Sequence, residues 1–164
     1  MALIKHNELV DDAFVDVTES QEIPPSGPVI VSVEQWRAHK PALVARAAPL
    51  GIRLRSDQSP ELIADDLEFF SVVALEFPMF RDGRAYSYAR LLRERFGFDG
   101  EVRAVGDVLM EQLHFMIRTG FDAFDLRESE DPLAAFRAAL DDFSVWYQPT
   151  GDGRPTALQL RHRK

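Results

Sequence analysis

The sequence predicts an α/β fold in which strands and helices alternate around a mostly parallel sheet. Residues 29–33 (Val-Ile-Val-Ser-Val) form a run rich in β-branched residues, which is typical of a strand buried on both faces. Further strand-like segments at residues 49–54, 69–77, 101–105 and 121–126 alternate with segments of helical periodicity. Such alternation implies right-handed crossovers and hence mostly parallel strands.

Two arrangements of this sheet are open. An open sheet covered by helices on both faces is favoured, because the chain holds only five or six strand–helix units and a complete TIM barrel needs eight. A partial, truncated TIM-barrel-like half is the alternative. Both belong to the same α/β class, and the pattern of apolar residues does not separate them.

At 164 residues the chain is expected to form one domain with its own core. Residues 1–27 are expected to hold a short N-terminal β-hairpin, with its turn near His6-Asn7, and then an acidic stretch and a Pro-rich linker. Residues 28–148 are expected to form the α/β domain. Residues 149–164 are expected to be a flexible, basic C-terminal tail.

The helices are placed by their caps and breakers. A helix over residues 34–47 is expected to be kinked or interrupted near Pro41. Other helices are expected at residues 60–66, 85–96, 108–119 and 132–140, with Ser59, Asp107 and Asp131 as starts and Gly97 and Gly120 as stops. Residues 143–147 are a candidate sixth strand.

Composition and charge narrow the function classes. The formal net charge of −8 argues against nonspecific binding to nucleic acid or anionic membranes. No apolar run is long enough to span a bilayer, and the N-terminus lacks the apolar region of a signal peptide. The absence of cysteine excludes a disulfide, a thiol nucleophile and a cysteine-ligated iron–sulfur cluster. A cytoplasmic protein is expected, with no nucleic-acid and no membrane partner.

The candidate site is the loop after the third main strand, which contains Arg81, Asp82, Gly83 and Arg84. Ligands of parallel α/β proteins bind outside the carboxyl ends of the strands. Paired guanidinium groups beside a helix start suit a small oxyanion. Alternatively, Asp82 makes an Asx turn, Gly83 takes a positive φ, and the arginines pair with Asp107 or Glu76. The loop matches neither a Walker motif nor a dinucleotide fingerprint.

Two further loops are expected at the same edge of the sheet, Gly106-Asp107 and Arg127-Glu128. Tyr86 and Ser87 offer hydroxyl groups next to the arginine-rich loop, although a role as a helix cap is favoured for Ser87. These residues indicate where a ligand would bind, but they identify neither the ligand nor a reaction.

Arg103 interrupts a strand that ought to be buried. A buried Arg needs a partner, and the candidates are Glu101, Asp107 and Asp122; otherwise Arg103 points into a functional cleft. The neighbouring Arg90, Arg93 and Arg95 are expected on a solvated helix face, together with Glu94.

A metal site is not expected. Glu111 and His114 stand at i, i+3 on one predicted helix, but no second Glu-x-x-His pair or histidine cluster accompanies them.

Residues 77–124 read FPMFRDGRAYSYARLLRERFGFDGEVRAVGDVLMEQLHFMIRTGFDAF. The motifs Phe-Pro-x-Phe-x-Asp-Gly-Arg-x-Tyr-Ser, Gly-Glu-x-Arg-Ala-x-Gly-Asp-Val-Leu and Gly-Phe-Asp-Ala-Phe within it resemble a bacterial family catalogued as domain of unknown function 934. The likeness is close over residues 75–126 and looser elsewhere. The signature polar residues, carried over by position, are Asp82, Gly83, Arg84, Tyr86, Ser87, Arg90, Glu101, Arg103, Gly106, Asp107, Gln112 and Arg118.

The resemblance implies an accessory or oxidoreductase-associated protein of assimilatory sulfite reduction, with sulfite reductase or its electron donor as the partner. The chain has Glu111 where the family usually has Asp, and Thr119 where Cys is frequent. The second difference counts against a thiol-based mechanism.

The residues themselves support a second hypothesis, an enzyme or sensor that binds a small oxyanion through the Arg81–Arg84 loop. Sulfite, sulfate and phosphorylated compounds are the candidate ligands. A flavin or nicotinamide oxidoreductase is a third hypothesis. The sequence identifies no catalytic residue and no cofactor.

Overall fold

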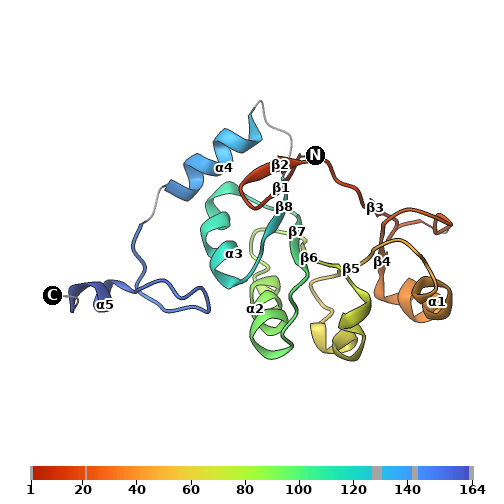
Figure 1. The fold of residues 1–164 in the computed structure, drawn as a ribbon. Helices are drawn as coiled ribbons and strands as arrows, with labels where there is room; N and C mark the ends of the chain where they lie inside the picture. Colours follow the sequence, from red (N-terminus) through yellow and green to blue (C-terminus); the bar gives the residue numbers. More distant parts are fainter. Residues whose placement is uncertain (1, 21, 127–130, 142–143, 163–164) are drawn as a thin grey trace.

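The computed structural model describes residues 2–20, 22–126, 131–141 and 144–162. Its strands form one eight-stranded sheet in the order β2-β1-β8-β7-β6-β5-β4-β3 (Figure 1). The strands are β1 (Ala2–Lys5), β2 (Glu8–Val10), β3 (Val15–Asp16), β4 (Val29–Ser32), β5 (Leu50–Leu54), β6 (Val72–Phe77), β7 (Glu101–Gly106) and β8 (Ala123–Leu126). From β3 to β8 all neighbours are parallel, whereas β1 is antiparallel to both β8 and β2.

The helices lie between the parallel strands and after them. The α-helices are α1 (Val33–Val44), α2 (Arg84–Arg90), α3 (Leu113–Thr119), α4 (Pro132–Asp141) and α5 (Ala157–Arg161). The 3₁₀-helical segments are η1 (Pro60–Phe69) and η3 (Met110–Gln112), and a π-helical turn, η2 (Leu91–Arg95), extends α2.

The sheet is a curled half barrel, and the strand order explains why. Strands β3 to β8 follow one another in space in the same order as in the chain. Right-handed crossovers that all step in one direction place their helices on one face, whereas an open doubly wound sheet needs a reversal of strand order. The predicted α/β class and the N-terminal hairpin are confirmed. Of the two arrangements, the structure has the barrel-like half, so helices do not cover both faces.

The main hydrophobic core lies between the convex face of the sheet and the helices. Alternate residues of the strands point there, as in Ile52, Val73 and Val102, each fully buried. The helices contribute Trp36 from α1 and Leu92 from η2, which are also buried. Since every second strand residue belongs to this core, the remaining strand residues face the concave side.

The concave side is crossed by the N-terminal segment. Strands β2 and β3 are consecutive in the chain but lie at opposite edges of the sheet. If the sheet were flat, the seven gaps between its eight strands, at about 4.8 Å each, would separate those edges by roughly 34 Å. The five residue steps from Val10 to Val15 span at most about 18 Å. The segment between β2 and β3 can therefore join them only if the sheet is curled and the segment crosses its concave side directly.

We call residues 11–18 the strap. Phe14, in the middle of the strap, packs on a small apolar cluster of the concave face formed by Ile30, Val72, Ala74 and Val105. Val17 continues the strap beyond β3 and donates its N–H to the carbonyl oxygen of Ile30 at 2.9 Å. The strap thus supplies one apolar side chain to a face that is otherwise rich in charge.

Proline, glycine and capping residues in the sequence predicted the positions of most helices, although the predicted start of one helix is wrong. The helix over residues 33–44 is kinked as expected, with non-helical φ and ψ at His39 two residues before Pro41. His6 and Asn7 have positive φ (50° and 65°) at the hairpin turn. Asp107 was expected to cap a helix, but its N–H continues the sheet edge by donating to the Phe77 carbonyl oxygen at 2.7 Å, and η3 starts at Met110.

The predicted strand at residues 143–147 is also wrong over residues 144–147, the part that the structure describes. Residues 144–147 contain no strand, and Trp146 makes an isolated bridge with Thr156. No helix in the described part of the chain is long and apolar enough to cross a membrane.

Gly106 is required at the carboxyl end of β7. Its φ is +92°, and a Cβ atom built there would lie 2.5 Å from the carbonyl oxygen of Phe77. We expect Gly106→Ala to destabilise the fold by at least about 3 kcal/mol, because strain and a backbone clash add. Gly97 is the matched control, since it has φ +63° but open space around it. Gly97→Ala should cost only about 1 kcal/mol, and urea denaturation of both variants measures the difference. Equal losses would contradict this account of Gly106.

Candidate functional site

A polar cleft opens at the carboxyl ends of β4, β5 and β6. Its volume is about 420 Å³. In barrel-like α/β proteins this edge carries the functional site, because the loops that follow the strands converge there. The lining residues are Thr18, Glu19, Ser20, Ser32, Glu34, Gln35, Arg53, Arg55, Gln58 and Glu76.

One wall of the cleft is the start of α1. The Ser32 hydroxyl accepts a hydrogen bond from the N–H of Gln35 (3.1 Å), and the Gln35 side chain accepts one from the N–H of Ser32 (2.8 Å), which forms a capping box. The Gln35 amide also donates to the carbonyl oxygens of Val17 and Ser20 at 2.8 and 2.9 Å. The helix start thereby holds the end of the strap against the mouth of the cleft.

Two arginines and three glutamates line the cleft, and two of the glutamates pair with the arginines. Arg53 pairs with Glu76 at 3.3 Å and with Asp16 of the strap at 3.0 Å. Arg55 pairs with Glu34 at 3.1 Å, and the side-chain amide of Gln58 donates to the same carboxylate at 3.0 Å. A bond from its own backbone N–H and the charge of Arg55 lower the pKa of Glu34 below its ordinary value. Glu34 is therefore charged at neutral pH.

The cleft can bind polar ligands that carry both an acceptor and a donor. Arg55 is 55% exposed and offers N–H groups to an anionic oxygen, while Glu34 and Glu76 accept from hydroxyl or ammonium groups. The sequence analysis did not single out Arg53, Arg55 or Glu34, and it named Glu76 only as a partner for the arginines of the loop at residues 81–84. The signal was the Arg-x-Arg spacing at the end of a strand, which places both side chains on the same face.

The predicted loop at residues 81–84 lies next to this cleft but is closed on itself. Arg84 binds both carboxylate oxygens of Asp82, with Nε to Oδ1 at 3.0 Å and Nη2 to Oδ2 at 2.6 Å. Arg84 Nη2 also donates to the hydroxyl of Ser56 at 3.0 Å, which joins the loops after β5 and β6. Hydrogen bonds from Arg84 hold the pKa of Asp82 well below its usual range. Arg81 is exposed. Gly83 is the N-cap of α2 with φ −94°, so the expected positive φ is wrong, and Arg84 pairs with Asp82 instead of Asp107 or Glu76.

Tyr86 and Ser87 lie on different sides of α2. Tyr86 packs among Phe77, Phe115 and Phe121, with ring centroids 5.1, 4.9 and 6.5 Å away, and burial raises its pKa to about 12. Ser87 lies within α2 and its side chain is exposed to solvent. Its expected role as a helix cap is wrong, because Gly83 is the N-cap. The two hydroxyl groups do not form one ligand-binding pair.

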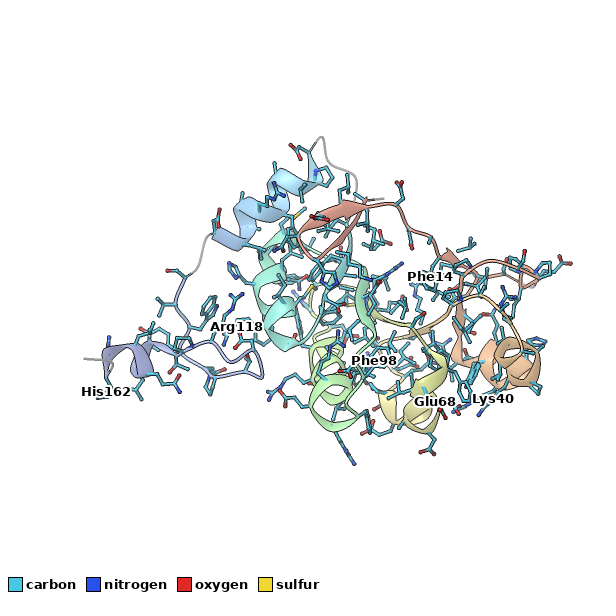
Figure 2. All side chains as sticks on the ribbon, in the orientation of Figure 1. Phe14, Lys40, Glu68, Phe98, Arg118 and His162 are labelled. Atoms are coloured by element: carbon cyan, nitrogen blue, oxygen red, sulfur yellow. The ribbon has the colours of Figure 1, made fainter. Side chains whose placement is uncertain are left out.

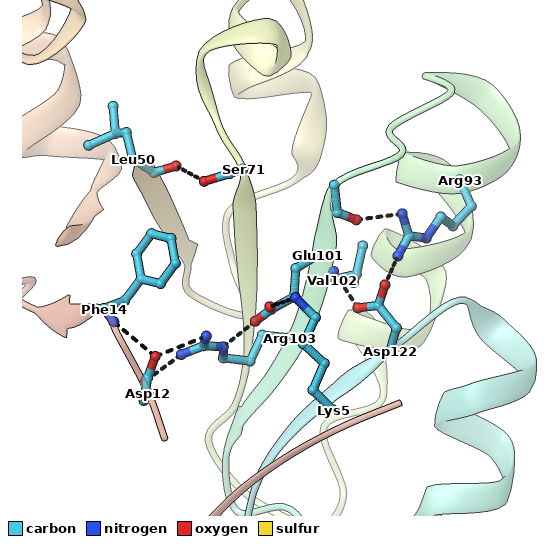
Figure 3. Close-up of polar contacts among 11 residues, drawn as sticks. Lys5, Asp12, Phe14, Leu50, Ser71, Arg93, Glu101, Val102, Arg103 and Asp122 are labelled. Atoms are coloured by element: carbon cyan, nitrogen blue, oxygen red, sulfur yellow. Dashed lines mark hydrogen bonds and ion pairs between the residues drawn. The ribbon is translucent and has the colours of Figure 1, made fainter. Parts of the chain in front are cut away.

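Arg103 lies on the concave face in the middle of β7 and is 3% exposed. Its guanidinium binds Glu101 (2.6 Å) and Asp12 of the strap (2.6 and 3.2 Å), and it lies 5.8 Å from the ring of Phe14 (Figure 3). Lys5 of β1 binds the other oxygen of Glu101 at 2.7 Å. Among the expected partners Glu101 is present, and Asp12, from a segment 91 residues away, was not foreseen.

The strand register shows how this face accommodates long cationic side chains. One row runs across six strands, with neighbours Ser32, Arg53, Ala74, Arg103, Ala123 and Lys5. Alanines alternate with the cations, so each long side chain lies over a small neighbour. Asp12, Phe14 and Asp16, at alternate positions of the extended strap, meet this row together.

The other candidates are distributed over the structure. Gln112 is buried and accepts a hydrogen bond from the N–H of Leu109 at 3.3 Å. Arg118 is buried on α3, where it binds Asp152 at 2.9 Å and the carbonyl oxygen of Gln148 at 2.7 Å. Asp107 follows β7 at the carboxyl edge. The loop Arg127-Glu128 lies outside the described residues.

Arg93 corrects the expectation of a solvated helix face. Its guanidinium donates to the carbonyl oxygens of Phe98, Gly100 and Gly120 and binds Asp122 at 2.9 Å. Asp122 in turn accepts from the N–H of Val102 at 2.9 Å (Figure 3). Arg93 therefore ties η2 to the amino ends of β7 and β8. By contrast, Arg90 pairs with Glu94 on the exposed surface, as expected.

Among the residues that the structure describes, no group of three or more His, Asp or Glu side chains is placed to hold a metal ion. The chain is thus a half-barrel α/β protein with a polar cleft at the carboxyl edge and an ion-paired concave face. It belongs to the family described as "Bacterial protein of unknown function (DUF934)", whose model matches residues 51–158. This match confirms the resemblance found in the sequence. The search of curated proteins found no match.

The ionic network under the strap can be tested by removing its central charge. Arg103→Met leaves Asp12 with only the N–H of Phe14 and Glu101 with only Lys5, so we expect a loss of about 3–5 kcal/mol in the free energy of unfolding. The control is Arg95→Met, since Arg95 is 65% exposed and 3.6 Å from Glu61; it should change stability by less than about 0.5 kcal/mol. Urea denaturation measures both. Similar values for the two variants would show that the network does not stabilise the fold.

Proposed function

We propose that this protein is an accessory protein of assimilatory sulfite reduction, which acts in the cytoplasm by binding sulfite reductase or its electron donor. The pathway comes from the family resemblance. The mode of action rests on one structural observation: several arginines of the family motifs are already paired with carboxylates of the chain itself. Arg84 binds Asp82, Arg103 binds Glu101, and Arg118 binds Asp152. Arginines committed to separate carboxylates favour a binding protein over a site that gathers them around one substrate.

An exposed aromatic residue supports binding to a protein. Phe80 belongs to the Phe-Pro-x-Phe motif, yet it is 57% exposed, and its neighbour Met79 is 58% exposed. Neither side chain belongs to the described core clusters. Exposed apolar side chains that folding does not require are typical of protein interfaces. Their position, in the loop after β6 beside the cleft, makes the carboxyl edge the proposed contact surface.

The test uses purified protein and the sulfite reductase of the same organism. We expect the enzyme or its electron donor to be retained on immobilised protein, and we expect Phe80→Ser to weaken this binding at least about tenfold because an aromatic anchor is lost. Phe80→Leu, which keeps an apolar side chain, is the matched control and should retain most binding. If neither partner is retained, and if addition of the protein leaves sulfite reduction unchanged, the proposed function is wrong.

A second candidate function is the binding of a small oxyanion, and the cleft favours it. The anion would lie against Arg55, whose side chain is 55% exposed, and not in the loop of Arg81 and Arg84, since Asp82 already occupies the Arg84 guanidinium. Arg53 lines the same cleft. An enzyme or sensor for sulfite, sulfate or a phosphorylated compound would use these groups.

Calorimetry separates the two arginine positions. If the cleft binds an oxyanion, titration with sulfite, sulfate or phosphate should produce heat, and Arg55→Ala should raise the Kd at least about tenfold by removing a charge-assisted contact. Arg84→Ala should have a smaller effect, and Arg95→Ala none. A larger effect of Arg84→Ala would show that the anion binds at the predicted loop of residues 81–84 and not in the cleft. Wild-type protein that gives no heat with any of the three anions would eliminate this candidate.

A further inference from the structure

The C-terminal arm, which we define as residues 144–162, extends away from the half barrel. In Figure 1 it leaves the body beside α3 and ends in α5, apart from the sheet and from the other helices. Thr156 starts α5 with a capping box, in which its hydroxyl accepts from the N–H of Gln159 (3.3 Å) and its own N–H donates to the Gln159 side chain (2.8 Å). These local hydrogen bonds explain why the short helix starts at this point.

The base of the arm is firmly held. Trp146 lies between two guanidinium groups, with Arg118 4.9 Å and Arg154 5.1 Å from the ring. Buried Arg118 also binds Asp152 and the carbonyl oxygen of Gln148 (Figure 2 labels Arg118 at this base). The N–H of Ala157 donates to the carbonyl oxygen of Trp146 at 2.7 Å, which closes the loop before α5. These contacts fix the direction in which the arm leaves the body.

The arm nevertheless carries apolar side chains in water. Tyr147 is 84% exposed and Leu158 63% exposed, and Val145 and Leu160 are exposed as well. Burying an exposed leucine side chain stabilises a protein or a complex by about 1.5–3 kcal/mol. The contacts at the base of the arm hold α5 away from the half barrel of the same chain, so these side chains are not buried there. This surface is therefore available to another molecule.

Charge indicates what that molecule is. The arm together with the two residues that follow it in the sequence, Arg163 and Lys164, holds four basic side chains and one acidic side chain, a net charge of +3. The whole chain has −8, so residues 1–143 carry −11. A basic, apolar-tipped arm and a strongly acidic body are complementary, and every copy of the chain supplies both. In a two-fold pair each arm meets the partner's body, so each favourable contact occurs twice.

We propose that the protein forms a homodimer by arm exchange, in which the C-terminal arm of one copy packs on the acidic body of a second copy. Leu158, Leu160 and Tyr147 provide the apolar contact, and Arg154 and Arg161 lie on the arm to provide the charge. This proposal does not depend on the proposed function, because it concerns the association of the chain with itself.

Analytical ultracentrifugation of the full-length protein over a range of concentrations tests the proposal. We expect a dimer with a Kd below about 100 μM. Leu158→Ser should raise that Kd at least about tenfold, whereas Leu158→Met, which keeps an apolar side chain, should leave it nearly unchanged. Arg161→Glu should weaken the dimer and Arg161→Lys should not. Added sodium chloride should weaken it too, because salt screens the attraction between arm and body.

Because the substituted side chains are exposed, every variant should keep the unfolding midpoint of the wild type, which confirms that its fold is intact. A wild-type protein that remains monomeric at all concentrations overturns the proposal. It is also overturned by a dimer that Leu158→Ser and Arg161→Glu leave unchanged, since the interface would then lie elsewhere. If the wild type is monomeric and Leu158→Ser loses only sulfite reductase binding, the arm serves that partner and the homodimer is wrong.

Discussion

The structure depends on a short connection between two strands at opposite edges of one sheet. Strands β2 and β3 are the outermost strands, and residues 11–14 join them. Four residues cannot bridge the width of a flat eight-stranded sheet. The curl of the sheet and the position of the strap on its concave face both follow from this length. The placement of all crossover helices on the convex face follows separately, from the consecutive order of the parallel strands.

A strap across a concave face must be held there, and the chain does this largely with ion pairs. The concave row contains Lys5, Arg53 and Arg103, and the strap brings Asp12 and Asp16 to the two arginines. Removing charges from water is costly, and here Arg103 donates hydrogen bonds to two carboxylates while Phe14 covers its guanidinium group. The interior of this half barrel thus contains a row of charges in register with alanines beside a small apolar cluster that includes Ile30, Val72 and Val105, whereas branched apolar layers fill a complete barrel.

The same geometry separates structural polar residues from those available to a ligand or a partner. Residues along the middle of the strands and under the helices, such as Arg103, Arg93 and Arg118, are enclosed by carboxylates and carbonyl oxygens. Residues at the carboxyl edge, such as Arg55 and Phe80, keep exposed surface. In a protein with many arginines, exposure and the number of existing partners identify functional candidates better than the residue type does. The arm at the C-terminus follows the same logic, since its exposed leucines and tyrosine have no role in the core.

The sequence by itself determined the features that depend on near neighbours. The β-branched runs located β4 and β6, Pro41 marked the kink in α1, and His6-Asn7 formed the hairpin turn. It also indicated that Arg103 needs a carboxylate, and Glu101 is two residues away. Only the tertiary structure decided that Asp12 is the second partner, that Arg53 and Arg55 line a cleft, and that Arg93 is enclosed while Arg90 is exposed. The physical reason is that periodicity reports which face of an element is buried, whereas strand order and curvature decide which distant residues meet on that face.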